Sequence, residues 1–391
     1  MNKIIDLGMH PYADTFIAEN QLGLSEPVYP LECWMSKATG EISLKYKTNP
    51  ADRYSLYNYS YTSSNSKFSR EHWDKYIKHT SKKINLKQNA NIIEIGSNDG
   101  YLTEQYQKSG HRALGVDPSR YMAEVAKSRG VDTYCDLFSE AVSDEIKKKY
   151  GPADCIVANN VFNHADDPLD FAKGVANLLC DDGIFIFEVP YWYNTIVDGR
   201  FDQIYHEHIS YFTVKYSRHL LDLAGLSVFD VEVVDYHGGS IRVYSKKSPE
   251  NVSASVNRLI QKEIDAGIFE PEIYSDFMKR IKNKRSLFME KIHSIIRDGK
   301  PIVGIGAAAK ANTFLNFYNI DNTIMEYITD ASEHKIGKYT PLTRIPILDD
   351  KTVLKKYEEM YAVILSWNIS DILIEKLKHL NGNITFLPTE S

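Results

Sequence analysis

Apolar runs of strand length alternate with amphipathic stretches through the middle of the chain. Asn91–Gly96 ("NIIEIG") and Gly183–Pro190 ("GIFIFEVP") have the length and composition of buried strands. Ser119–Gly130 ("SRYMAEVAKSRG") has the period of an amphipathic helix. Strands that alternate with helices predict a parallel sheet with helices on both faces. We therefore expect an α/β domain over residues 71–248.

The region before this domain has a different pattern. Residues 1–70 are rich in Pro, Tyr and Ser and contain only short strand-like pieces, which predicts a small, irregular N-terminal domain. An amphipathic helix is expected over residues 69–84, with Ser69 as its candidate N-cap.

The region after the central domain begins with polar helices. Two long helices are expected within residues 252–298, and a second strand–turn–helix unit starts at Pro301. This pattern predicts a smaller, Rossmann-like domain over residues 249–391.

Composition excludes several classes of protein. The chain has 391 residues and a formal net charge of −6, which argues against a nucleic-acid partner because such proteins normally carry a basic surface. No apolar run approaches the ~18 residues of a membrane span. The first residues lack the apolar core of a signal peptide, so we expect a cytoplasmic protein. The four cysteines are scattered, as is typical of reduced core thiols.

The first candidate site follows the strand at Asn91. In "EIGSNDGYL", Gly96 allows a sharp turn and Gly100 permits the close approach of a ligand or a helix. Asp117 ends the next strand about 20 residues further on, where a carboxylate can hold ribose hydroxyls. The combination resembles the S-adenosylmethionine (SAM) site of class I methyltransferases; an ordinary tight turn of an α/β domain is the alternative. The expected SAM-binding residues are Glu94, Gly96, Ser97, Asn98, Asp99, Gly100 and Asp117.

From about Ile5 to Pro388 the chain resembles the sugar C-methyltransferases that act on nucleotide-linked keto-deoxysugars. The resemblance rests on ordered motifs that include "DLGMHPYADTF", "EIGSNDGYL", "ANNVFNHADD", "FEVPY", "FDQIYHEHISYF", "HGGSIRVY", "GIGAAAKANTFLNF" and "SWN". In that family the first domain binds zinc, the middle domain binds SAM, and the last, Rossmann-like domain helps to hold the substrate.

The chain departs from this family in its first domain. The family carries two cysteine pairs as zinc ligands, whereas here no cysteine precedes Cys33, and Ser36 and Thr39 stand where the second pair is expected. Hydroxyls are poor zinc ligands beside thiolates, so we expect no zinc. Packing around Tyr29, Leu31 and Trp34 is expected to hold this domain together.

The segment Phe201–Phe212 ("FDQIYHEHISYF") carries the candidate catalytic residues. An extended segment would place Tyr205 and Glu207 on one side and His206 and His208 on the other, whereas a helical turn would bring Tyr205 and His208 together. The resemblance implies that Tyr205, Glu207 and His208 lie in the active site. His208 is the better base, because free His titrates at about 6.5 and free Tyr at about 10. Tyr205 can donate to an enolate or relay a proton, Glu207 can orient a ring or bind a sugar hydroxyl, and His206 is assigned a structural role.

Other residues join this site through the resemblance. His164 follows a strand whose end faces the SAM site, and the resemblance places it near the acceptor oxygen; a lone histidine there is otherwise structural. Asn160 is expected to line the methyl-donor pocket. Tyr59, with Tyr61 as a competitor, resembles the family's tyrosine that reaches from the first domain into the cleft.

Two further turns are candidates for binding the substrate. In "HGGSIRV", the glycine pair with His237, Gly238, Ser240 and Arg242 suits a diphosphate, unless it is a plain hairpin with a surface arginine.

The second of these turns is "VGIGAAAKANTF". With Asp330 about 20 residues on, it has the spacing of an NAD fingerprint and raises the alternative of a dehydrogenase. The SAM-like turn lies in the larger domain and both turns match one methyltransferase family. We therefore interpret the second turn as an anion cradle with Lys310 and Asn312 as donors, or else as a Rossmann half that only packs.

The sequence therefore predicts a SAM-dependent C-methyltransferase that acts on a nucleotide-diphosphate 4-keto-6-deoxysugar at C3. One alternative is a relative that methylates oxygen, nitrogen or a different acceptor. Another is a non-catalytic protein that binds SAM or nucleotide sugars. The base of the nucleotide, the stereochemistry and the oligomeric state are not predicted.

Overall fold

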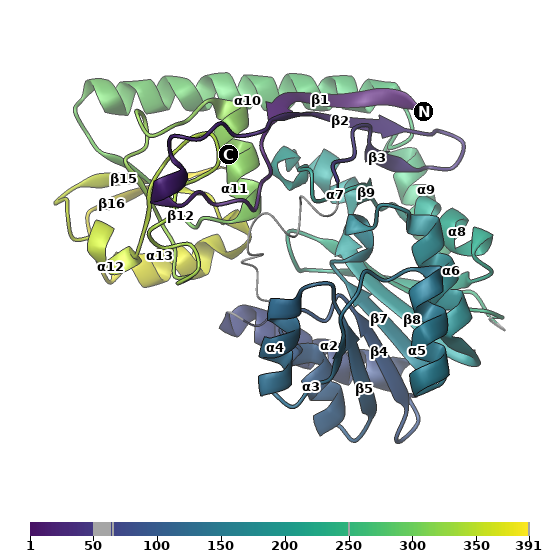
Figure 1. Cartoon of the computed structure of the whole chain (residues 1–391). Helices are drawn as coiled ribbons and strands as arrows, with labels where there is room; N and C mark the ends of the chain where they lie inside the picture. Colours follow the sequence, from purple (N-terminus) through teal and green to yellow (C-terminus); the bar gives the residue numbers. More distant parts are fainter. Residues whose placement is uncertain (50–63, 65, 249–250, 390–391) are drawn as a thin grey trace.

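Three sheets organise the chain in the computed structural model, which describes residues 1–49, 64, 66–248 and 251–389 (Figure 1). A four-stranded sheet forms the N-terminal part, a seven-stranded sheet the centre, and a five-stranded sheet the C-terminal part. The expected α/β class is confirmed.

The central sheet has the strand order β10-β11-β8-β7-β4-β5-β6. All its neighbours run parallel except at β11, which is antiparallel to both β8 and β10. This is the arrangement of class I SAM-dependent methyltransferases, as the sequence predicted. The strands are β4 (Asn91–Ile95), β5 (Arg112–Val116), β6 (Thr133–Tyr134), β7 (Ala153–Asn159), β8 (Leu179–Pro190), β10 (Ser227–Val234) and β11 (Ser240–Lys246).

Helices cover both faces of this sheet because parallel strands such as β4 are apolar on both sides. Apolar residues of α2 and α3 fill the core of one face, and those of α5, α6, α8 and α9 the core of the other. The helices are α2 (Lys67–Lys83), α3 (Tyr101–Lys108), α4 (Arg120–Ser128), α5 (Glu140–Tyr150), α6 (Pro168–Leu178), α7 (Trp192–Val197), α8 (Val214–Leu223) and α9 (Ala254–Asp265), with 3-10 turns η2 (Phe162–His164) and η3 (Phe201–Gln203).

Two details of these helices differ from the expectation. Helix α2 starts earlier, because the side chain of Ser66 accepts the backbone N–H of Ser69 at 3.0 Å; Ser66, and not Ser69, is the N-cap. Helix α9 lies beyond residue 248, yet Val256, Leu259 and Ile260 pack in the core of the central sheet.

The N-terminal sheet has the order β1-β2-β3-β9, and its last strand comes from the candidate catalytic segment. Its strands are β1 (Asn2–His10), β2 (Tyr29–Met35), β3 (Ile42–Leu44) and β9 (Ser210–Tyr211), with the 3-10 turn η1 (Glu19–Gln21) after β1. Leu31 lies in the core as expected, together with Cys33, Met35 and Ile42. Trp34 does not, because alternate residues of β2 point outward, and its Nε1 donates to Glu32 at 3.0 Å.

The C-terminal sheet is parallel throughout, with the order β14-β13-β12-β15-β16. The long helix α10 runs from this sheet along β1 (Figure 1). The strands are β12 (Ile302–Ile305), β13 (Tyr327–Thr329), β14 (Ile347–Leu348), β15 (Met360–Ile364) and β16 (Ile384–Pro388). The helices are α10 (Pro271–Arg297), α11 (Ala309–Tyr318), α12 (Asp350–Val353) and α13 (Ser370–Lys378), with the 3-10 turn η4 (Trp367–Ile369). None of the helices in the described part of the chain is long and apolar enough to cross a bilayer.

The hairpin between β2 and β3 stands where the sequence led us to expect a lost zinc site. Cys33 is fully buried among apolar side chains, and burial raises the pKa of its thiol. The turn is closed by backbone hydrogen bonds from Ser36 to Glu41 (2.9 Å) and from Gly40 to Ser36 (2.8 Å). Outside residues 50–63, 65, 249–250 and 390–391, no group of three or more His, Cys, Asp or Glu side chains is arranged to hold a metal ion.

We predict that the isolated protein contains no stoichiometric zinc and that a strong chelator leaves its melting temperature unchanged. The reason is that hydrogen bonds and apolar packing already close the hairpin around Cys33. Elemental analysis and thermal unfolding with and without chelator check this. About one zinc per chain, or a fall in melting temperature on chelation, would contradict it.

Candidate active site

The glycine turn after β4 is held by the end of the next strand. Gly96 has φ +73° and donates its N–H to the carbonyl of Val116 at 2.7 Å, and a Cβ there would lie 2.7 Å from Val161. The carboxylate of Asp117 accepts the N–H of Asn98 and that of Ser119, each at 2.9 Å. Asp117 therefore positions the turn itself, and burial raises its pKa.

Buried polar atoms without partners surround this turn. In the described chain, no hydrogen-bond partner exists for Ser97 Oγ, Asn160 Oδ1, or either amide atom of Asn159 and Asn163. Leaving a buried polar atom unpaired costs about 1–3 kcal/mol, so these atoms fit a polar ligand such as SAM at the ends of β4 and β7. Sequence reasoning missed Asn159 and Asn163; their clustering in "NNVFN" was the available signal.

The other acidic residues of the turn are already engaged. Glu94 accepts the hydroxyl of Thr103, and burial raises the pKa of Glu94 to about 8. Asp99 accepts the hydroxyl of Ser64 and lies 3.4 Å from Arg129. These contacts tie the turn to α3 and to the segment that leads into α2.

The segment Tyr205–His208 forms a turn, the second of the two conformations considered. The N–H of His208 donates to the carbonyl of Tyr205 at 2.9 Å, and their rings lie 3.9 Å apart. The ring of His164, from η2, lies 4.9 Å from that of His208 and perpendicular to it. The structure thus brings together three of the predicted catalytic residues.

The hydrogen bonding of His208 fixes its tautomer. Its Nδ1 lies 3.0 Å from the carbonyl oxygen of Gln203, which can only accept, so Nδ1 carries the proton and Nε2 holds the lone pair. Burial lowers the pKa of His208 to about 4, well below the value of about 6.5 for a free histidine side chain. The imidazole is therefore neutral near pH 7.

Glu207 and His206 hold backbone segments of the N-terminal part. Glu207 accepts the N–H of Asp14 at 2.9 Å and that of Ala13 at 3.5 Å. The ring nitrogens of His206 lie 3.3 Å from the carbonyl of Pro11 and 3.4 Å from that of Pro30. Glu207 therefore holds the backbone at Ala13 and Asp14 in place. The contacts of His206 with the two carbonyls fit the structural role expected for it.

A cationic and aromatic group lies where the C-terminal part meets the centre. The ammonium of Lys310 lies 4.0 Å from the ring centroid of Trp367, and the guanidinium of Arg200 lies 4.6 Å from it. Trp367 donates to Asp202 at 2.6 Å, and Arg200 donates to the carbonyl of Gly238. A Cβ on Gly238 would collide with both Arg200 and Trp367, so glycine is required for this contact.

Two of the predicted substrate-binding residues have other roles. Arg242 lies within β11 and is buried; its Nε and Nη2 donate to Glu188 at 2.9 and 2.7 Å. Ser240 is fully buried and donates to the carbonyl of Tyr236 at 3.0 Å. The prediction of a diphosphate ligand for Arg242 and Ser240 is wrong, because both residues lie in β11, whose residues are buried on both faces of the sheet.

The remaining predicted residues are placed as follows. His237 is half-buried with φ +51° and accepts, at its carbonyl, the amide of Gln203 at 2.6 Å. Asn312 donates to the carbonyl of Ala13, and its Oδ1 has no partner in the described chain. Tyr59 and its competitor Tyr61 lie outside the described residues.

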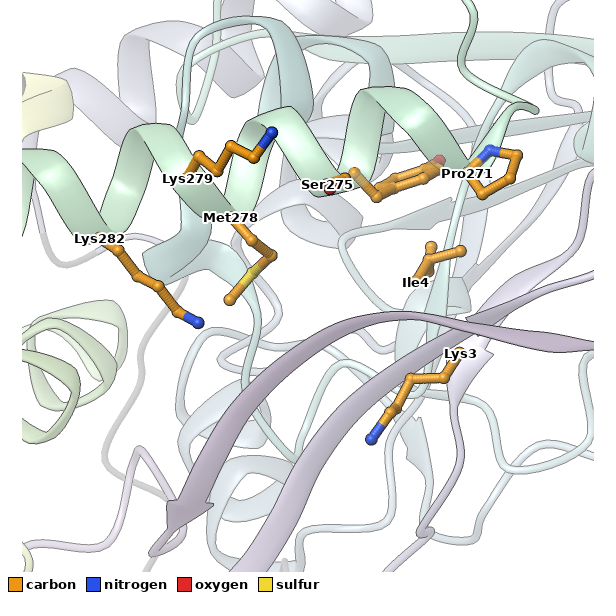
Figure 2. Close-up of a pocket in the computed structure, with 8 residues that line it drawn as sticks. Lys3, Ile4, Pro271, Ser275, Met278, Lys279 and Lys282 are labelled. Atoms are coloured by element: carbon orange, nitrogen blue, oxygen red, sulfur yellow. The ribbon is translucent and has the colours of Figure 1, made fainter.

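Two cavities lie away from the ends of the central strands. One, of about 260 Å³, is lined by Arg200 and Trp367 and by aromatic residues of η3 and α11. The other, of about 400 Å³, lies between β1 and α10 and is lined by Lys3, Lys279 and Lys282 (Figure 2). The second contains none of the groups expected for methyl transfer.

Two family models match successive parts of the chain. Residues 66–231 match a family model described as "Methyltransferase domain", and residues 235–387 match one described as "C-methyltransferase C-terminal domain". The C-methyltransferase NovU of Streptomyces niveus is 29% identical over 389 residues, which cover 98% of this chain and 92% of NovU.

More distant proteins share only part of the chain. A ubiquinone biosynthesis O-methyltransferase of Coxiella burnetii (strain Dugway 5J108-111) is 24% identical over 177 residues, 41% of this chain and 73% of that enzyme. The crystal structure of an S-adenosylmethionine-dependent methyltransferase from Clostridium acetobutylicum is 16% identical with a TM-score of 0.37, covering 51% of this chain and 96% of that one.

We predict that Asp117→Ala weakens SAM binding by about 1–3 kcal/mol, because the turn loses the carboxylate that holds the N–H groups of Asn98 and Ser119. Asp330→Ala is a matched control: Asp330 accepts the N–H of Ala307 and of Ser332 at the second glycine turn. Calorimetry should show unchanged SAM affinity for the control. Unchanged affinity for Asp117→Ala, or an equal loss in both variants, would remove Asp117 from the SAM site.

Proposed function

For this chain, which belongs to the SAM-dependent C-methyltransferases, we propose that the acceptor is a nucleotide-diphosphate 4-keto-6-deoxysugar and that the methylated atom is C3. The observation that carries the proposal is the neutral imidazole of His208. It is held by the carbonyl of Gln203, with the rings of Tyr205 and His164 beside it.

These three side chains supply what removal of a proton next to a ketone requires. The lone pair on Nε2 of His208 takes the C3 proton, and the electrons of that C–H bond pass into the C3–C4 bond as the C4 oxygen becomes an enolate oxygen. Tyr205 and His164 are close enough to His208 to hydrogen-bond an oxygen at the same place. The carbonyl of Gln203 keeps Nδ1–H in place, so the imidazolium that forms stays oriented.

SAM fits the polar groups around the first glycine turn and, when bound, supplies an electrophilic methyl group for the enolate carbon. Ser97, Asn159 and Asn160 offer the unpartnered atoms that would hold it, with Asp117 for ribose hydroxyls. The turn at Tyr205 brings the base to the same edge of the central sheet, so that the acceptor carbon and the methyl donor can meet in line.

The nucleotide part of the acceptor is supported by the contacts around Trp367. Lys310 and Arg200 place two positive charges beside its indole ring, and the backbone of Gly238 approaches closely. Cations beside a glycine turn can bind the oxygens of a diphosphate, and aromatic rings can stack on a nucleotide base or on one face of a sugar. We assign the diphosphate to Lys310, with His237 and Gly238 lining its path.

We expect methyl transfer from SAM to a nucleotide keto-sugar to add one methyl group on carbon, with loss of the exchangeable ring proton. Incubation with a panel of nucleotide-diphosphate keto-sugars, followed by mass spectrometry and NMR of the product, checks this. A methyl group on oxygen or nitrogen would identify a relative with another acceptor. Tight binding of both ligands without turnover would identify a non-catalytic binding protein.

We predict that His208→Asn lowers methyl transfer by about 10²- to 10⁴-fold, the usual loss for a positioned base, while both ligands still bind. The variant should also slow deuterium exchange of the ring proton, which needs the base and not the methyl donor. His293→Asn, an exposed histidine of α10, serves as the control and should exchange at the wild-type rate. Wild-type exchange by His208→Asn would move the base elsewhere, with Tyr205 the first candidate.

We also predict that exchange in the wild-type protein shows no inflection near pH 6.5. The pKa of His208 is lowered to about 4, so its active, neutral form persists as pH falls and is lost only as pH passes through about 4. Exchange rates from pH 8 to pH 4, with circular dichroism at each pH to monitor folding, test this. An inflection near 6.5 that disappears in His208→Asn would contradict the assigned environment.

A further inference from the structure

A second histidine is held by a buried ion pair at the edge of the same site. His72, on α2, places Nε2 2.8 Å from Oε1 of Glu188, and Arg242 donates twice to the other carboxylate oxygen. Glu188 is fully buried. Burial alone would raise the pKa of Glu188, but the hydrogen bond from His72 and the charge of Arg242 hold it below its usual value.

This arrangement fixes which nitrogen of His72 carries the proton. An ionised carboxylate can only accept, so Nε2 of His72 carries a proton and donates to Glu188, and Nδ1 is the ring nitrogen left for a second contact. Within the described residues, no hydrogen bond engages Nδ1. The ring is stacked on Tyr236, with centroids 3.6 Å apart and planes 5° apart, so it cannot turn freely.

A chain of contacts links His72 to His208. Tyr236 stacks on His72 and its ring lies 4.1 Å from that of His237. The carbonyl of His237 accepts the side-chain amide of Gln203, whose own carbonyl holds His208. Burial lowers the pKa of His237 to about 3.

Glu188 also connects His72 to the methyl-donor side. Its carbonyl accepts the N–H of Asn160 at 2.7 Å. In the sheet, Glu188 pairs directly with Asn159 of β7, and the side-chain amide of Asn159 has no hydrogen-bond partner in the described chain. A ligand that reaches the ends of β7 and β8 therefore meets the edge of His72.

We propose that His72 recognises the acceptor sugar, with Nδ1 accepting a hydrogen bond from one of its ring hydroxyl or amino groups, and that Glu188 and Arg242 are the positioning residues for this contact. The inference rests on the proposed function, because it takes the acceptor to be a nucleotide-linked sugar. It adds a specificity-determining residue on α2, a helix that none of the matching motifs includes.

His79 provides a matched control on the same helix. Its Nε2 lies 2.9 Å from Glu232, a contact of the same kind, but its side chain is 52% exposed, whereas that of His72 is 13% exposed. His72→Leu removes the acceptor atom, and His72→Gln keeps both functions, since its amide can donate to Glu188 and accept from a sugar hydroxyl.

The test is steady-state kinetics with SAM and a nucleotide keto-sugar, together with calorimetry of SAM binding. We expect His72→Leu to lower kcat/KM for the sugar about tenfold, the size of one hydrogen bond, and to leave SAM affinity within about twofold. His72→Gln should recover most of the loss, and His79→Leu should match the wild type. Melting temperatures identify any variant that fails to fold.

A measurement on the wild-type protein keeps the proposal testable if His72→Leu does not fold. The ¹⁵N resonance of His72 Nδ1, assigned by its absence in His72→Gln, should shift when the nucleotide keto-sugar is added and not when SAM alone is added. Unchanged kcat/KM in His72→Leu would overturn the proposal, as would lost SAM affinity with normal use of the sugar or an equal loss in His79→Leu. If the wild type uses no nucleotide keto-sugar, the proposed function fails and this inference fails with it.

Discussion

The site depends on one segment, Phe201–Phe212, whose polar groups bind the other two parts of the chain. Glu207 holds the backbone of Ala13 and Asp14, and Ser210–Tyr211 pairs with β3. On the other side, Thr313 donates to the carbonyl of Ile204 at 3.2 Å and Asp202 accepts from Trp367. The side chains of Glu207, Thr313, Asp202 and Trp367 are buried, so breaking one of their contacts leaves a polar atom without a partner and away from water. The position of His208 therefore depends on contacts that its segment makes with both the N-terminal and the C-terminal parts of the chain.

The same hydrogen-bonding pattern stabilises both glycine turns. Asp117 directly follows β5 and Asp330 directly follows β13. Each carboxylate accepts two backbone N–H groups, one from the glycine turn and one from the residue two positions after the aspartate. The glycines before them, Gly96 and Gly306, donate to the strand that ends at the aspartate. The turns differ in what surrounds them: the first adjoins unpartnered buried amides, and the second adjoins Lys310 and Trp367. The shared geometry therefore does not imply a shared ligand.

Local patterns predicted the parts of the structure that depend on neighbours in sequence. The alternation of strands and helices predicted the central sheet. The sequence also singled out both the glycine turn and Asp117, which the structure joins through the N–H of Asn98. The predictions were wrong where the orientation or burial of a single side chain had to be inferred. Trp34 points outward because its neighbours Cys33 and Met35 point inward, and the short hydrophobic pattern of β2 did not show which residues face the core. Arg242 is buried because β11 is covered on both faces, which is a property of the assembled fold.

Contacts that join distant elements were not predictable from the sequence. His72, Glu188 and Arg242 belong to α2, β8 and β11, and only the register of the sheet brings Glu188 opposite Arg242. The resemblance named residues within its motifs, so it supplied His164 and His208 but gave no reason to consider His72. The environment of His208 was also hidden, because burial sets its pKa and burial is a property of the assembled fold.

The pairing of β9 with β3 limits how this architecture can be recombined. A chimera that exchanges the N-terminal residues for those of a relative would also exchange the strand on which Ser210 and Tyr211 are aligned, and the carbonyls that hold His206. The N-terminal residues and the segment Phe201–Phe212 must therefore be exchanged together, because each forms one side of the same interface.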